Sequence, residues 1–167
     1  MTEAQMTGGM RVDANRLLGR LADLAEVGAT EADGCARLAL TDDDKAGRDL
    51  VVSWMEDLGL EVRIDAIGNV VAQRPGRDDS LAPVMCGSHI DTVRTGGRYD
   101  GNYGVLAGLE VIETLERAGH ETVRPLAVAF FTALRAGRVR CARRGPRRAD
   151  REAAGPHPAQ DAVRCRP

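Results

Sequence analysis

The sequence predicts an α/β domain with a mixed, mostly parallel sheet flanked by helices. Three segments carry apolar residues at helical spacing, and two apolar runs have the length and composition of buried strands. Along the chain the order is helix, helix, hairpin, strand, helix, strand, which is typical of α/β domains. After Thr132 the composition changes abruptly. We therefore expect a flexible segment over 1–12, a domain over 13–133 and a disordered tail over 134–167.

Two helices are predicted in the first third of the chain. The first spans residues 13–27 and ends at Gly28. Its apolar side carries Leu17, Leu18, Leu21, Leu24 and Ala25. The second begins after Thr41, whose side chain can cap a first turn rich in aspartate, and ends near Gly59. Its buried stripe is expected to hold Leu50, Val51, Trp54, Met55 and Leu58.

A hairpin follows the second helix. Residues 60–66 and 69–73 are rich in Val and Ile around Ile67-Gly68, a dipeptide suited to a turn. The next strand opens at residues 83–86, and its continuous apolar character predicts burial on both faces.

The last helix and strand complete the predicted domain. Residues 101–118 form a helix ended by Gly119, with Val105, Leu106, Leu109, Ile112 and Leu115 on one stripe and Glu110, Glu113 and Glu116 on another. Residues 125–132 predict another buried strand.

Charge and cysteine usage narrow the class of protein. The net charge of -2 combines a net of -9 over residues 1–134 with a net of +7 over residues 135–167. The four cysteines show no CxxC spacing, which predicts reduced thiols and no zinc ribbon. No signal-peptide pattern and no apolar run of about 18 residues is present, so we expect a cytoplasmic protein without membrane contacts.

One imidazole and two carboxylates lie between the second apolar strand and the last helix. His89 and Asp91 follow the strand, where parallel sheets place their ligands, and Asp91 could accept the second ring N–H of His89. Asp100 follows on a loop whose glycines could let it bend back towards the imidazole. These residue types predict a metal-dependent hydrolase, although a histidine at a strand end is also compatible with a merely hydrogen-bonded role.

The longer strings are more specific. Gly-Ser-His-Ile-Asp-Thr-Val over 87–93 and Gly-Gly-Arg-Tyr-Asp-Gly-Asn-Tyr-Gly-Val from Gly96 resemble the amidase/hydantoinase/carbamoylase branch of the zinc-dependent aminoacylase and carboxypeptidase superfamily. That branch includes N-carbamoyl-L-amino acid hydrolases, β-ureidopropionases and allantoate amidohydrolases. The resemblance runs from about Asn15 to Thr132 and implies the N-terminal part of a zinc-exopeptidase-like catalytic domain.

The resemblance implies roles for three residues. His89 would bind one metal, Asp100 would bridge two, and Asp91 would orient His89. The ions would be Zn²⁺ or Mn²⁺, two in an intact site and incomplete here. The implied reaction is hydrolysis of non-peptide C–N bonds in small ureido or amidine substrates such as N-carbamoyl-L-amino acids or allantoate. A homodimer is implied for intact family members and is not expected of this chain.

The sequence departs from the family after the last strand. The family carries its general base and a further ligand in a Glu-Glu string there, whereas this chain reads Thr132-Ala133-Leu134-Arg135. The general base is thus missing, and we expect a truncated, inactive polypeptide. Of the 33 residues from Arg135, 24 are Arg, Ala, Gly or Pro, which favours a shift of reading frame. An unpaired sheet edge and poor solubility should follow.

Other functions stay open. The ten arginines of residues 135–167 could form a nucleic-acid-binding tail on a non-catalytic fragment, although no aromatic residue is present there for stacking. A solvated natural extension is a further alternative for these residues. A peptidase or deacylase of the same superfamily is the third candidate function.

Overall fold

The computed structural model describes residues 9–31 and 33–132. Its elements are α1 (Ala14–Glu26), α2 (Asp42–Asp57), β1 (Glu61–Ile64), β2 (Val70–Arg74), β3 (Val84–Ser88), α3 (Asn102–Arg117) and β4 (Leu126–Phe130). This order and the α/β class confirm the predictions. The predicted disordered tail and most of the predicted flexible N-terminus lie outside the described residues, so they and the domain boundaries stay predictions.

The four strands form one mixed sheet in the order β1-β2-β4-β3. A mixed sheet was expected, but in place of a mostly parallel arrangement two of the three pairings, β1–β2 and β2–β4, are antiparallel. β2 reverses direction because the predicted tight hairpin at Gly68 joins it to β1. β3 and β4 are parallel because α3 crosses over between them, with Gly87 opposite Ala129.

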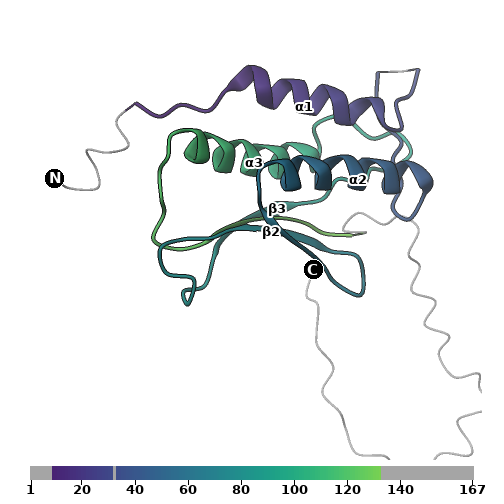
Figure 1. Ribbon diagram of the computed structural model, residues 1–167. Helices are drawn as coiled ribbons and strands as arrows, with labels where there is room; N and C mark the ends of the chain where they lie inside the picture. Colours follow the sequence, from purple (N-terminus) through teal and green to yellow (C-terminus); the bar gives the residue numbers. More distant parts are fainter. Residues whose placement is uncertain (1–8, 32, 133–167) are drawn as a thin grey trace, which may run out of the picture.

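The helices lie on one side of the sheet in two tiers. Figure 1 shows α2 and α3 over the sheet and α1 stacked on top of them. α3 can lie close to the sheet because Gly104 and Gly108 face it; a Cβ on Gly108 would be 3.1 Å from Val128 Cγ2 and 3.3 Å from Cys86 Cβ. The core formed by the sheet and the three helices contains Leu24, Val51, Met55, Val70, Val105, Leu109, Val128 and Phe130. The predicted apolar stripes are therefore largely confirmed, with Leu18 as an exposed exception.

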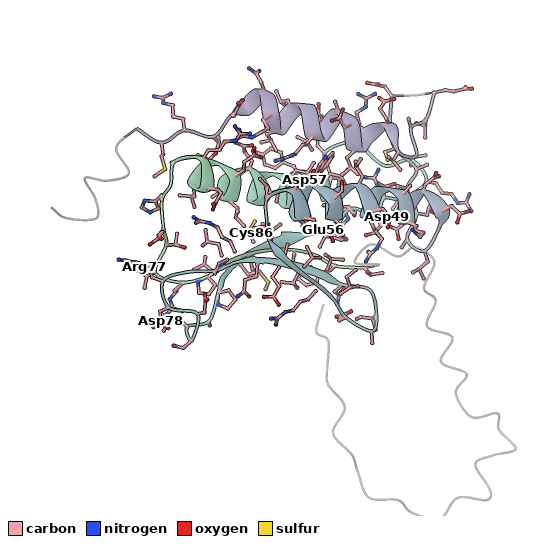
Figure 2. All side chains as sticks on the ribbon, in the orientation of Figure 1. Asp49, Glu56, Asp57, Arg77, Asp78 and Cys86 are labelled. Carbon is pink, nitrogen blue, oxygen red and sulfur yellow. The ribbon has the colours of Figure 1, made fainter. Side chains whose placement is uncertain are left out.

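β3 does not have the predicted burial on both faces. Val84 is 58% exposed and Met85 is 48% exposed. The apolar sequence of this strand was interpreted as that of an inner strand, but β3 is at the edge of the described sheet. Its apolar side chains meet α3 on one side, where Figure 2 shows Cys86 between sheet and helices. The remainder of β3 is covered by none of the described segments.

α1 is held on α3 by a buried ion network that the periodicity did not predict. Glu110 is fully buried and accepts hydrogen bonds from Arg16 Nε and Nη2, each at 2.7 Å. Glu113 is 3% exposed, and its carboxylate lies 2.7 Å from Arg20 and 2.8 Å from Arg117. The glutamate stripe of α3 is thus an inter-helix contact surface at these two positions, because α1 supplies the arginines.

Candidate metal site

The protonation pattern of His89 is set by its backbone environment. The residue directly follows β3, is 6% exposed, and holds its ring Nδ1 2.8 Å from the carbonyl oxygen of Asp91. A carbonyl oxygen only accepts hydrogen bonds, so Nδ1 must carry the proton. In the neutral ring this leaves the lone pair on Nε2, which is the state that a metal-binding imidazole requires.

Asp91 contacts the imidazole differently from the sequence-based expectation. Its backbone carbonyl takes the close contact, whereas its carboxylate Oδ1 lies 3.7 Å from His89 Nδ1. The side chain is 3% exposed, and Oδ1 has no hydrogen-bond partner among the described residues. Burial raises the pKa of this carboxyl, while the charges of His89 and Arg37 act to lower the pKa. An orphaned buried carboxylate oxygen beside an imidazole is compatible with a nearby cation.

Asp100 directly precedes Gly101, the residue that packs on the His89 ring. Asp100 is exposed in the turn before α3. Gly101 lies directly on the imidazole: a Cβ added to it would be 2.4 Å from His89 Cε1 and 2.5 Å from the His89 carbonyl oxygen. Its backbone, at φ 76° and ψ -52°, is in a region open mainly to glycine. The structure thus places Asp100 one residue from the backbone that covers the His89 ring.

The residue whose site position sequence reasoning missed is Arg37. It lies in the connection between α1 and α2, and it is fully buried. Its Nε donates to the Ile90 carbonyl at 2.9 Å, and its backbone N–H donates to Thr92 Oγ1 at 2.7 Å. Burial lowers the pKa of Arg37, while nearby acidic groups act to raise it. A single arginine within the apolar run Cys35 to Leu40 was the available signal.

The donor set fits one side of a metal site. Within residues 9–31 and 33–132 no group of three His, Cys, Asp or Glu side chains is placed to hold a metal ion. His89 offers an unprotonated Nε2 and Asp100 a carboxylate, which are the nitrogen and oxygen ligands that zinc and manganese accept. The predicted position of the general base, after Thr132, is outside the described residues.

Comparison with known proteins shows which proteins this chain resembles. Residues 69–133 match peptidase family M28. The chain is 43% identical over 122 residues to the N-carbamoyl-L-amino-acid amidohydrolase of Rhizobium meliloti, covering 73% of this chain and 29% of that protein. It is 40% identical over 93 residues to the allantoate amidohydrolase of Bacillus subtilis, covering 56% of this chain and 23% of that protein.

A solved structure extends the similarity to the fold. A hydantoinase/carbamoylase family amidase from Burkholderia ambifaria superposes with a TM-score of 0.72 at 53% identity, over 74% of this chain and 30% of that one. The chain is related to the hydantoinase/carbamoylase amidases. It spans about three tenths of the length of the curated N-carbamoyl-L-amino-acid amidohydrolases it matches.

More distant similarity concerns the fold alone. The aminopeptidase PepT from Bacillus cereus shares 19% identity and a TM-score of 0.59 with this amidase-related chain, over 77% of this chain and 39% of that one. Among the described residues, none of the helices has the length and apolar character needed to span a membrane.

Proposed function

We propose that residues 13–132 form one side of a dinuclear site in a hydrolase of non-peptide C–N bonds. The observation that carries the proposal is the His89 ring, whose Nδ1–H is held by a backbone carbonyl and whose Nε2 is left to bind a metal ion. His89 would bind one ion and Asp100 would bridge two. His89 directly follows β3 and Asp100 precedes α3, in a chain 43% identical over 122 residues to an N-carbamoyl-L-amino-acid amidohydrolase.

The substrates we propose are N-carbamoyl-L-amino acids, ureido acids and linear amidines such as allantoate. Relatives named for the first and third of these groups support the choice. When bound, Zn²⁺ or Mn²⁺ polarises a carbonyl and acidifies a water molecule. The chain's own residues do the positioning: Asp91 holds the tautomer of His89 through its main chain, and Gly101 allows the loop that carries Asp100 to lie against the imidazole.

The 167-residue polypeptide itself should not turn over substrate. His89 and Asp100 are two ligands, no three-ligand group exists in the described part of the chain, and no Glu-Glu string follows Thr132. The cytoplasmic location stays a prediction. The expectation that intact family members form a homodimer, and that this chain does not, also stays a prediction.

A chimera tests the proposal. Residues 1–132 replace the matching segment of the Rhizobium meliloti relative, and the purified protein is assayed with Zn²⁺ or Mn²⁺ on an N-carbamoyl-L-amino acid, allantoate and a dipeptide. We expect hydrolysis of the carbamoyl substrate, and its loss in His89→Ala. The matched control is His120→Ala, which changes the histidine after α3 and should leave the rate unchanged. A folded chimera that is inactive, or one indifferent to His89→Ala, contradicts the proposal.

A peptidase is the second candidate because the matched family is named as one. The dipeptide arm addresses it: hydrolysis of the dipeptide without hydrolysis of either ureido substrate would favour the peptidase over the amidase.

A further inference from the structure

The side chain of Arg37 binds three other segments of the chain, the end of α1, the residues after β3 and the start of α3. It is fully buried, and its donors are directed at fixed acceptors in the surrounding backbone and side chains. Nη1 donates to the carbonyl oxygens of Leu24 and Val27, both at 2.7 Å, and so holds the end of α1. Nε donates to the Ile90 carbonyl at 2.9 Å, and Nη2 donates to Asn102 Oδ1 at 3.1 Å.

Two of these contacts flank the proposed metal ligands. Ile90 lies between His89 and Asp91. Arg37 binds the Ile90 carbonyl, and the carbonyl of the next residue, Asp91, accepts the hydrogen bond from His89 Nδ1–H. Asn102 is the first residue of α3 and lies two residues after Asp100. Its own side-chain amide donates to the Arg98 carbonyl at 2.8 Å, which closes the loop that contains Asp100.

We propose that Arg37 is a positioning residue for the metal site, which fixes His89 and Asp100 relative to each other by binding Ile90 and Asn102 with one planar guanidinium. The inference rests on the proposed function, because it gives His89 and Asp100 their roles as ligands. Arg37 acts through the backbone carbonyl of Ile90 on one side of the site and through the side-chain amide of Asn102 on the other.

The guanidinium is suited to this task in a way that lysine is not. Its donors are fixed in one plane, whereas an ammonium is a compact point donor on a flexible stem. α2 makes room for it at Gly47, where a Cβ would be 2.5 Å from Arg37 Cδ and 2.9 Å from Nε. Gly47→Ala should therefore displace the guanidinium without removing its charge, while alanine itself favours the helix.

The tautomer of His89 provides a readout that a purely structural arginine would not change. In the ¹⁵N-labelled 167-residue chain at a pH of about 8, the ring nitrogen shifts of His89 report the ratio of the Nδ1–H to the Nε2–H form. We expect the Nδ1–H form to predominate in the wild type. Arg37→Lys, Arg37→Met and Gly47→Ala should each lower this ratio by about fivefold, the equivalent of weakening one hydrogen bond.

Arg74→Met is the matched control. Arg74 is also buried, at 8% exposure, and donates to Glu116 at 2.7 Å and to the His120 carbonyl at 2.8 Å, at the opposite end of α3 from Asn102. It should lower the melting temperature but leave the His89 ratio unchanged. If Arg37→Met does not fold, Gly47→Ala decides the outcome. A folded Arg37 or Gly47 variant with the wild-type ratio overturns the proposal.

A second arm separates this proposal from the proposed function. Millimolar Mn²⁺ broadens NMR signals of nearby nuclei even when it binds weakly, so it should broaden His89 and Asp100 together in the wild type, and less so in Gly47→Ala. A wild-type chain in which neither residue responds to Mn²⁺ overturns both proposals. If Mn²⁺ broadens the signals of His89 and Asp100 equally in the wild type and in Gly47→Ala, and the tautomer ratio is also unchanged, the role of Arg37 is overturned while the proposed function stands.

Discussion

Gly101→Ala should destabilise the domain more than any other single alanine substitution at a described glycine with positive φ. Gly101 combines two requirements in one residue: a φ of 76° and contact with the His89 ring, since an added Cβ would be 2.4 Å from Cε1 and 2.6 Å from Nδ1. The carbonyl oxygen of His89 lies 2.5 Å from the same point. The methyl group therefore meets both a buried ring and rigid backbone.

The two costs can be worked out separately. An L-residue at positive φ costs about 1–2 kcal/mol, and overpacking against a buried group costs about 1–3 kcal/mol more. We expect a loss of about 3 kcal/mol in the free energy of unfolding. Gly119→Ala isolates the first cost, because Gly119 has φ 61° with nothing within 4 Å of an added Cβ, and it should lose about 1 kcal/mol. Gly97→Ala, in the same loop as Gly101 but with open space and no positive φ, should change stability by less than about 0.5 kcal/mol.

Urea unfolding followed by far-ultraviolet circular dichroism measures all three variants against the wild type. The expected order of destabilisation is Gly101 above Gly119 above Gly97. A Gly101→Ala variant that loses no more than Gly119→Ala would show that the His89 ring does not pack on this backbone, and the proposed closeness of Asp100 to His89 would lose its support.

Two further predictions concern α3 and the sheet edge. Burial acts to raise the pKa of Glu110, but hydrogen bonds from Arg16, the Asp13 backbone and Thr114 outweigh it, so the pKa lies below its ordinary value. A depressed pKa contributes stability above the ordinary value of about 4.3 that is lost as the pH falls through the folded-state pKa. Glu110→Gln should thus cost about 2 kcal/mol at pH 7 and progressively less below pH 4, and an equal loss at pH 7 and pH 3 would contradict the network. At the sheet edge, the double variant Val84→Lys with Met85→Lys should reduce light scattering by aggregates. The control Val123→Lys, at an exposed valine outside the strands, should not reduce the scattering. Equal scattering by the double variant and the control would contradict aggregation through the β3 edge.

Local sequence patterns predicted the elements well because their causes are local. Asp13 and Thr41 cap α1 and α2 through their own side chains. The hairpin turn is held by Asp65, which accepts from the backbone of Ile67 and Asn69. These signals act within a few residues, so periodicity, capping and turn chemistry located three helices and the hairpin from the sequence alone.

Features that depend on distant segments were not predictable in this way. The burial of Glu110 requires Arg16, 94 residues away in the sequence. The role of Arg37 requires Ile90 and Asn102, which become its neighbours only when the sheet and α3 have formed. The exposure of β3 has the same origin, since an apolar strand looks identical in sequence whether it lies inside a sheet or at its edge. At the site, residue types identified His89 and Asp91, but only the coordinates distinguish the Asp91 carbonyl from its carboxylate.

Metal content of the chimera tests most directly whether this chain supplies two ligands of a dinuclear site. After loading with Zn²⁺ and removal of free ions, elemental analysis of the folded chimera should find about two ions per chain. Asp100→Ala should lose both ions because a bridging carboxylate serves each of them, whereas His89→Ala should lose one. Unchanged metal content in both folded variants would contradict the account.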